Sequence, residues 1–285
     1  MRLDQEEQSS NVEDRRGSRV SRGLATGGIG TLALVLIGLF FGIDPTVLLQ
    51  GTGVDTNAPP PQTEQGAADS NDPMKDFVAR VLGSTERTWG EIFARNGRTY
   101  QPAKLVLFSG GVQSACGFAQ TAAGPFYCPE DYKVYIDLDF YRELRDRFHA
   151  PGDFAQAYVI AHEVGHHVQN QLGIMKTLQQ RQRRSSQAQA NALSVRIELQ
   201  ADCFAGVWAR SANEQRKILE EGDIEEGLNA AAQIGDDRIQ KRAQGYIVPE
   251  SFTHGSAQQR VQWFRRGISQ GNISQCDTFG ADSAA

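Results

Sequence analysis

Two histidines and a glutamate in the middle of the chain have the types and spacing needed to bind and use a metal ion. His162, Glu163 and His166 form the pattern H-E-x-x-H. An α-helix places residues i and i+4 one turn apart on one face, so both imidazoles can bind the same ion. The Glu163 carboxylate can then reach a water on that ion and act as general base, as in zinc peptidases. The pattern also occurs by chance in exposed helical turns, and that alternative stays open here.

A third ligand has to come from elsewhere in the chain. A catalytic zinc ion takes three protein ligands and leaves a fourth position for water. The extended pattern that supplies a third histidine is absent, because Leu172 stands at its position. Glu198 is the best candidate, and Asp202 lies one helical turn later on the same face. Asp202 could accept a hydrogen bond from the far nitrogen of a ligand histidine. The reverse assignment, with Asp202 as the ligand, remains open.

The helix that carries the motif has clear boundaries in the sequence. Pro151 and Gly152 interrupt the preceding pattern, and Asp153 is a suitable N-cap with Gln156 in the capping-box position. Apolar residues then recur at helical spacing, and the helix should end near Gly173. A rigid helix is a suitable support for a preorganised site.

Other periodic segments surround this helix. We expect an α+β fold, mostly helical and zincin-like, with a small β-sheet. The strand 134–138 is a candidate edge strand that could pair with an extended peptide substrate. The expected helices are 74–96, with a potential break at Gly83, then 140–149, 191–211, two between 214 and 244, and one after 260; the expected strands are 104–108 and 134–138.

An apolar run lies near the start of the chain. Residues 24–43 carry no charge and are rich in Leu, Ile, Val and Phe, so they can cross a bilayer as one helix. Arginines stand before the run at positions 15, 16, 19 and 22, and no Lys or Arg follows it until Lys75. This asymmetry predicts a cytoplasmic N-terminus and an extracytoplasmic domain. A cleaved signal peptide is the alternative, but the run is long for one and no small-x-small site follows it.

The chain therefore divides into four parts: a cytoplasmic tail (1–23), a transmembrane signal anchor of the cell membrane (24–43), a flexible linker (44–73) and a zinc metallopeptidase domain (74–285). The linker is rich in Gly, Pro, Asp, Asn and Gln. The chain of 285 residues is long enough for a sizeable core. Its net charge of -5 gives no reason to expect a nucleic-acid partner.

Four cysteines support an oxidising compartment. An even number of cysteines outside the cytoplasm predicts two disulfides. Cys116 and Cys128 are close in sequence and flank a Gly/Ala-rich turn, so we pair them, which leaves Cys203 with Cys276. A cysteine-rich zinc site is disfavoured because no C-x-x-C occurs.

Several segments together resemble a known family. The H-E-x-G-H motif followed by E-x-x-A-D is similar to the gluzincin pattern of HtpX-like and prenyl-protein zinc endopeptidases. The closer resemblance is to the bacterial YpfJ-like family of neutral zinc metallopeptidases. It is carried by GPFYCP (124–129), VYIDL (134–138), AHEVGHHVQ (161–169), ELQADCFAG (198–206) and THGS (253–256). The resemblance implies a membrane-anchored zinc peptidase and does not supply a substrate.

Two further residues are candidates through the same resemblance. Thr253-His254-Gly255 resembles the Thr-His-Pro that precedes an arginine in HtpX-like peptidases, and Arg260 stands at a comparable distance. His254 or Arg260 would then stabilise the oxyanion. A structural loop histidine and a salt-bridged arginine are the alternative. His167 points about 100° away from His166 around the helix, so we interpret it as structural.

The predicted activity is zinc-dependent hydrolysis of a peptide or protein. One Zn²⁺ would be held by His162, His166 and Glu198, with Glu163 as general base. A catalytically silent, zinc-stabilised binding module outside the membrane is the alternative, and the intact Glu163 argues against it. A cell-wall peptide substrate would fit the same residues.

Overall fold

The computed structural model describes residues 1–16, 72–120 and 124–280. The apolar run 24–43 and almost all of the expected linker lie outside these residues. Within them, no helix combines the length and the apolar character that crossing a bilayer requires.

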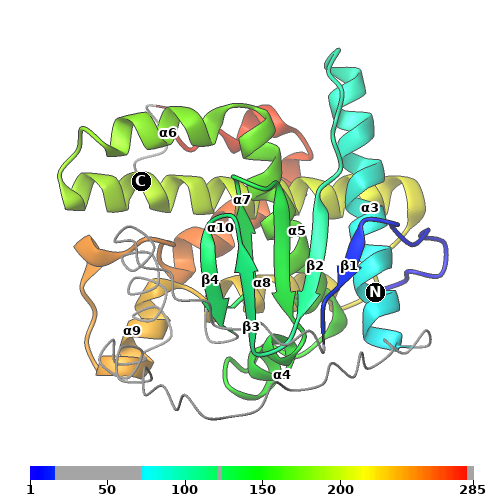
Figure 1. Cartoon of the computed structure of the whole chain (residues 1–285), viewed down its shortest axis with the longest axis horizontal. Helices are drawn as coiled ribbons and strands as arrows, with labels where there is room; N and C mark the ends of the chain where they lie inside the picture. The colour runs from blue at the N-terminus through cyan, green and yellow to red at the C-terminus, as the bar shows by residue number, and fades with distance from the viewer. Residues whose placement is uncertain (17–71, 121–123, 281–285) are drawn as a thin grey trace, which may run out of the picture.

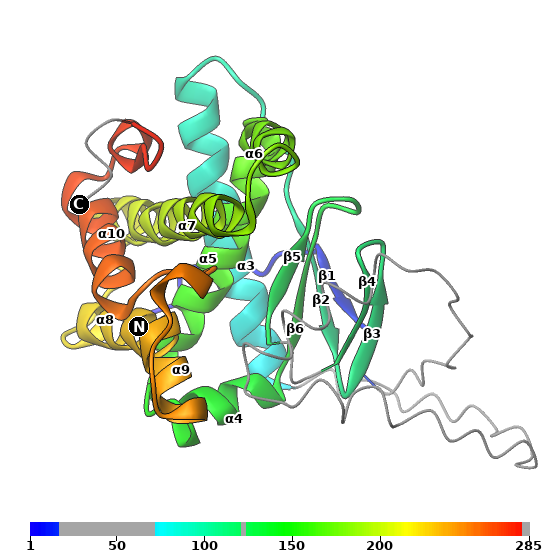
Figure 2. The ribbon, with the colours of Figure 1, turned by 90° about the vertical axis from the view of Figure 1, so that its left-hand side faces the viewer.

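The expected α+β class is correct: helices make up most of the domain and the strands form two small sheets. Figure 2 shows the strands on one side of the molecule and α7, α8, α9 and α10 on the other, with α5 between them.

The larger sheet has four strands in the order β1-β2-β6-β5. The strands β1 (Val12–Asp14), β2 (Lys104–Phe108) and β6 (Lys133–Asp137) are parallel, and β5 (Phe126–Cys128) pairs antiparallel with β6. The expectation that 134–138 forms the edge strand is wrong, because β6 lies between β2 and β5. Its burial agrees with that position, since Val134, Tyr135 and Ile136 are buried on both faces.

A separate hairpin covers the outer face of this sheet. The strands β3 (Gly111–Ser114) and β4 (Gly117–Gln120) pair antiparallel. Val106, Phe108 and Tyr135 of the large sheet form a small apolar cluster with Val112 and Ala119 of the hairpin. The disulfide Cys116–Cys128 joins the tip of the hairpin to the end of β5.

The first helix, α3 (Pro73–Arg95), runs without interruption through Gly83. Asp72 caps it by accepting hydrogen bonds from the backbone N–H groups of Met74 and Lys75. Its apolar side packs into the main core, where Trp89 meets Phe204 edge to face.

Residues 1–16 belong to the same domain, although the sequence analysis assigned them to a separate tail. The blue N-terminal strand β1 lies beside β2, close to α3 (Figure 1). Its register aligns Val12 with Leu105 and Asp14 with Leu107. A strand of three residues that contains Glu13 and Asp14 carries almost no periodic apolar signal, which explains why sequence reasoning missed it.

The central helix is α5 (Asp153–Gln171), and every residue from Phe154 to Gln169 except Gln156 is buried. A helix that is buried all round belongs in the core of a domain. The N-cap residue is Gly152, with φ 116°, so Asp153 is the first helical residue and not the expected cap. A β-carbon on Gly152 would collide with the carboxylate of Glu226, which accepts a hydrogen bond from the N–H of Phe154 at 3.1 Å.

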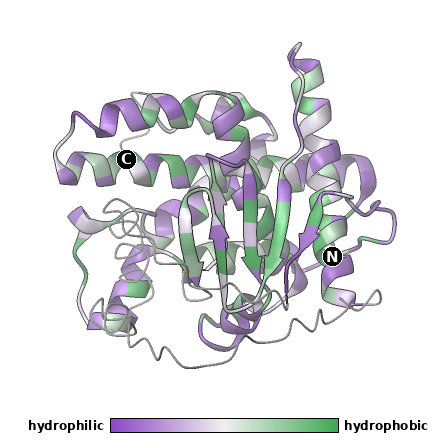
Figure 3. Ribbon diagram, viewed as in Figure 1, coloured by the Kyte–Doolittle hydropathy of each residue, from purple (hydrophilic) through white to green (hydrophobic). Residues whose placement is uncertain are grey.

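The described residues contain six more α-helices: α4 (Asp139–Asp146), α6 (Ile174–Gln182), α7 (Gln187–Arg216), α8 (Asp223–Gln233), α9 (Asp236–Gln244) and α10 (Ala257–Gln270). The 30-residue α7 lies between α5 and α10. Figure 3 shows α6 largely hydrophilic on the outside of the molecule, in contrast with the apolar β2.

The helices α7 and α10 approach each other closely at two glycines. A β-carbon on Gly206 would lie 2.3 Å from the carbonyl oxygen of Phe264, and one on Gly267 would lie 2.0 Å from that of Cys203. The predicted disulfide Cys203–Cys276 links α7 to the end of the chain just beyond α10. Both predicted disulfide pairs are therefore confirmed.

Candidate metal centre

His162 and His166 of α5 face Glu198 of α7. The Nε2 atom of His162 lies 3.1 Å from one Glu198 oxygen, and the Nε2 of His166 lies 3.3 Å from the other. One ligand atom from each of the three residues falls within 4.8 Å of the other two. Gly165 makes this possible, because a β-carbon there would already lie only 3.1–3.3 Å from Ala201 of α7. The three predicted ligands are thus brought together.

The hydrogen bonds behind the two rings determine which nitrogens are free. The Nδ1 of His162 lies 2.8 Å from a carboxylate oxygen of Asp202, and the Nδ1 of His166 lies 2.9 Å from the amide oxygen of Gln169. Both partners are acceptors, so each Nδ1 carries the hydrogen. Each Nε2 therefore presents its lone pair towards the other ring and Glu198. This is the tautomer that a metal ligand needs, and two such nitrogens with one carboxylate suit zinc.

Sequence reasoning did not assign Gln169 a role. Its side-chain N–H₂ donates to the carbonyl of Ile197 at 2.7 Å and to the side-chain oxygen of Gln200 at 3.1 Å, which fixes the amide so that its oxygen faces His166. The available signal was its position three residues after His166, on the same side of the helix.

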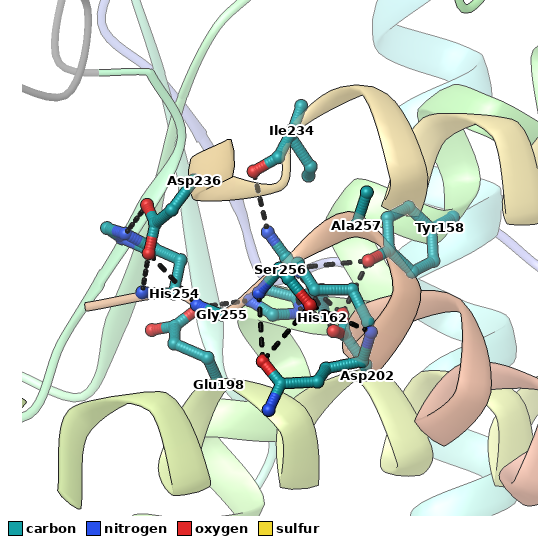
Figure 4. Close-up of polar contacts among 12 residues, drawn as sticks. Tyr158, His162, Glu198, Asp202, Ile234, Asp236, His254, Gly255, Ser256 and Ala257 are labelled. Carbon is teal, nitrogen blue, oxygen red and sulfur yellow. Dashed lines mark hydrogen bonds and ion pairs between the residues drawn. The ribbon is translucent and has the colours of Figure 1, made fainter. Parts of the chain in front are cut away.

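Asp202 is fully buried behind His162 and lies at the centre of a polar cluster. It accepts hydrogen bonds from the Tyr158 hydroxyl, from His162, and from both Nε and Nη2 of Arg260 at 2.9 Å each. Figure 4 shows Asp202 and Tyr158 on the opposite side of His162 from Glu198. Asp202 is therefore placed to orient His162, and Glu198 to bind the ion.

Arg260 forms the salt bridge that the sequence analysis left open as the alternative to an oxyanion role, and its partner is Asp202. Its guanidinium contacts Asp202, the Tyr158 hydroxyl and the carbonyl of Ile234, and its side chain is 2% exposed. These contacts lie along the Nδ1 edge of His162, away from the Nε2 atom that faces Glu198. Arg260 neutralises the buried charge of Asp202. Spacing in the sequence could bring Arg260 near the site but could not show which way the side chain points.

Glu163 is buried beside the two histidines. Among the described residues, none donates a hydrogen bond to its carboxylate, so its oxygens are free for water or substrate. Burial raises the pKa of Glu163, although the neighbouring His166 and His162 oppose that effect. A carboxylate with a raised pKa is a better proton acceptor near neutral pH.

Charge within the centre favours a cation. Burial would raise the pKa of Glu198, yet His166 and His254 hold it well below its usual range. Burial would lower the pKa of His162, yet Asp202 and Glu198 raise it to about 9. Each carboxylate thus stabilises positive charge at its neighbour, which is also what a ligand set for a positive ion does.

His254 is held near this centre by Asp236, a residue to which the sequence analysis assigned no role. One oxygen of Asp236 accepts the backbone N–H groups of Thr253, His254 and Gly255 at 2.8, 2.7 and 3.0 Å. The other oxygen lies 3.4 Å from Nδ1 of His254. Burial lowers the pKa of His254, but Glu198 and Asp236 outweigh it and leave the pKa raised. A carboxylate that caps three consecutive amides fixes the loop and the ring together.

His167 lies apart from the centre, as its direction around the helix implied. Its Nε2 contacts the carbonyl of Gln101 at 2.7 Å and its Nδ1 contacts the hydroxyl of Tyr127 at 3.1 Å. This ring connects α5 to β5 and to the loop after α3.

Comparison with known proteins agrees with this geometry. The chain is 48% identical to the uncharacterized protein YpfJ of Escherichia coli over 98% of its own length and 99% of that protein. It is 40% identical to the uncharacterized protein Rv2575 of Mycobacterium tuberculosis, with 85% of each chain covered. No solved structure matches it. Residues 1–279 match the family described as "Putative neutral zinc metallopeptidase", and the chain therefore belongs to that family.

Proposed function

We propose that the protein is a zinc-dependent peptidase that hydrolyses peptide bonds at the centre formed by α5 and α7. The observation that carries the proposal is the combination of two Nδ1-anchored histidines with a buried glutamate, Glu163, that has no hydrogen-bond donor among the described residues. His162, His166 and Glu198 would hold the ion. Bound zinc would act as a Lewis acid and lower the pKa of a bound water to about 7.

The chain's own residues supply the proton transfers. Glu163 accepts a proton from the attacking water and passes it to the departing amine. His254, oriented by Asp236, donates a hydrogen bond to the carbonyl oxygen as negative charge develops there. Asp202 and Gln169 keep the two ligand rings in the tautomer that the site needs.

An extended peptide substrate would pair with β5. The sequence analysis favoured 134–138 for this role, but that strand is β6, which lies inside the sheet. In the described sheet, β5 is an outer strand. It lies beside α5, since Asn170 donates to the Tyr127 hydroxyl at 2.9 Å. An extended peptide that adds to this edge would place its backbone next to the metal-binding helix.

Membrane attachment and an extracytoplasmic location remain proposals. The apolar run 24–43 motivates the first. Two disulfides support an oxidising compartment. A peptide or protein is the proposed substrate, and we propose no nucleic-acid partner.

The decisive experiment compares Glu163→Gln with the wild type after both are loaded with zinc. Glutamine has nearly the same shape but cannot accept the proton, so hydrolysis of a peptide library should fall by about 10²–10⁴-fold while zinc content stays unchanged. Glu214→Gln on the exposed part of α7 is the matched control and should keep full activity. Equal cleavage by wild type and Glu163→Gln would remove Glu163 as the base. Absence of cleavage by the wild type, with retained binding of a partner, would favour the silent binding module.

A second measurement tests the ligands. Glu198→Ala should lose zinc, as should His162→Ala and His166→Ala, when metal content is measured on purified protein. Full zinc occupancy in Glu198→Ala would exclude Glu198 as the third ligand.

A further inference from the structure

The first sixteen residues, which we call the N-terminal segment (residues 1–16), are built into the metallopeptidase domain by contacts of several kinds. Three residues pair as a parallel strand with β2. Leu3 and Val12 pack against the main apolar core. The backbone of Ser9 donates to the carbonyl of Ala79 on α3 at 2.9 Å. The segment therefore contacts the sheet, the core and a helix together.

Buried and half-buried charged residues also bind the N-terminal segment to the rest of the domain. Glu6 is almost fully buried and pairs with Arg216 near the end of α7, whose side chain is also buried. Arg80 of α3 donates to the carbonyl of Glu6 at 2.7 Å. Glu13 pairs with Lys133 of β6 at 3.0 Å. Loss of the segment would leave Arg216 without its carboxylate inside the protein, which is costly.

The N-terminal segment explains why a glycine stands at position 83 inside α3. A glycine in a helix interior is unfavourable compared with alanine. At Gly83, however, a β-carbon would lie 2.2 Å from the carbonyl oxygen of Glu7. At Gly90, two turns later on the same helix, a β-carbon would meet nothing within 4 Å. The helix is thus shaped at Gly83 to receive this segment.

The two described residues that flank the stretch 17–71 lie next to each other in the folded domain. Arg16, the last described residue before the gap, forms ion pairs with Asp14 and with Asp72, the first residue after it. Asp72 is also the N-cap of α3. The stretch 17–71, which contains the apolar run 24–43, therefore starts and ends at adjacent points of the folded domain.

We propose that the N-terminal segment and the metal centre lie on the same side of any membrane that the run 24–43 enters, so that this run does not carry the chain across. A bilayer core about 30 Å thick cannot separate two strands that pair within one sheet. The topology expected from the sequence puts residues 1–23 and the domain on opposite sides, and that arrangement would break β1 from β2 and Glu6 from Arg216.

The arginines before the apolar run, which predicted a cytoplasmic N-terminus, have a second interpretation when the N-terminal segment is docked on the domain. Arg15 pairs with Glu13 at 2.5 Å, and Arg16 pairs with Asp14 and Asp72. Two of the four arginines that suggested a cytoplasmic N-terminus are thus part of the fold. The charges of Arg15 and Arg16 are matched inside the domain and need no cytoplasmic environment to account for them.

Cysteine labelling tests the proposal directly. Ser10→Cys in the N-terminal segment and Ser269→Cys in α10 each add one exposed thiol, because the four native cysteines are in disulfides. Right-side-out and inverted membrane vesicles are treated with a membrane-impermeant maleimide. The proposal predicts that both thiols react from the same face. Reaction of Ser10→Cys from one face and Ser269→Cys from the other would overturn it.

Two glycine variants provide a test on the purified full chain that needs no membrane. Gly90→Ala should raise Tm by about 2–4 °C, because alanine favours the helix. Gly83→Ala should lower Tm and expose the N-terminal segment to protease, because its β-carbon meets the carbonyl of Glu7. An equal rise in Tm for both variants, with unchanged protease resistance, would show that the segment is not docked on α3 and would contradict the proposal. Neither outcome depends on peptidase activity.

Discussion

The metal centre and the N-terminal segment are both essential parts of one domain, but they are built in opposite ways. The centre uses residues from the interiors of two long helices, and its polar groups are buried and individually matched. The N-terminal segment uses a three-residue strand and charged side chains, many of them partly exposed. Its partners are far away in sequence: Glu6 pairs with Arg216.

The two constructions differ in how well a single sequence reveals them. Helical spacing is local, so His162, His166 and the pair Glu198 and Asp202 could be found from their separation alone. A short charged edge strand is stabilised by its neighbours in the fold and leaves no period of its own. We expect the two regions to be energetically independent as well. A change in the N-terminal segment should therefore leave zinc affinity unaltered.

The largest effect is expected for Asp202→Ala. The variant leaves Arg260 buried without its carboxylate, so the free energy of unfolding should fall by about 3–5 kcal/mol. Zinc affinity should fall by about 10–100-fold, because His162 loses the acceptor that orients it. Thermal unfolding and zinc titration measure the two effects. The double variant Asp202→Leu with Arg260→Met should recover stability but not zinc affinity. Wild-type zinc affinity in that double variant would show that Asp202 does not position the ligand.

The two disulfides should differ in effect. The pair Cys203–Cys276 joins residues 73 apart, and the pair Cys116–Cys128 joins residues 12 apart. In the chain-entropy account, Cys203→Ala with Cys276→Ala costs about 4 kcal/mol and the other pair about 3 kcal/mol. Denaturant unfolding of the two double variants gives the comparison. A larger loss from the short loop would indicate that local strain or packing outweighs loop entropy.

Glu6→Gln should weaken the N-terminal segment without affecting the metal centre. It removes the carboxylate from buried Arg216, so the free energy of unfolding should fall by about 1–3 kcal/mol. The matched control is Glu7→Gln, an exposed neighbour that should change stability by less than about 0.5 kcal/mol. Zinc affinity should stay at the wild-type value in both. A parallel loss of zinc in Glu6→Gln would show that the two regions are coupled.

The smallest effect is a response to acid confined to the N-terminal segment. Hydrogen bonding and charge from Arg16 lower the pKa of Asp14 from 3.8 to about 2. The pKa of Asp14 is lower in the folded protein than in the unfolded chain, so the ionised carboxylate stabilises docking of the N-terminal segment above about pH 4. This stabilisation disappears as the pH falls towards 2. The protection factors of the β1 amides, which are the exchange rates corrected for intrinsic exchange, should therefore fall below about pH 4 and stay constant between pH 5 and 7. Protection factors of the β1 amides that stay constant across pH 2–7 would exclude this role.

Several parts of the fold and the site could be predicted because their causes are local. The helix around His162 follows from apolar spacing and a Pro-Gly break, and the structure places its end within two residues of the expected one. The strand 104–108 was predicted with its observed bounds, Lys104–Phe108. The cysteine pairs followed from an even count and one short separation.

Other features could not be predicted because their causes are distant contacts. The position of β6 inside the sheet depends on β5 and β2 pairing on either side of it. The direction of Arg260 depends on Asp202 and Tyr158, which belong to other helices. The importance of Asp236 appears only where the loop carrying His254 folds back onto its carboxylate.

The sequence alone was sufficient to predict the chemistry that we propose, because residue type and helical spacing are properties of neighbouring residues. These properties predict two imidazoles and one carboxylate as metal ligands and a second carboxylate as the proposed base. Only the tertiary structure shows which side chains face the space between His162, His166 and Glu198 and which lie behind the two rings, because that depends on how α5, α7 and α10 pack. It also decided that the first sixteen residues share a sheet with the catalytic domain, since strand pairing joins residues that are about ninety positions apart.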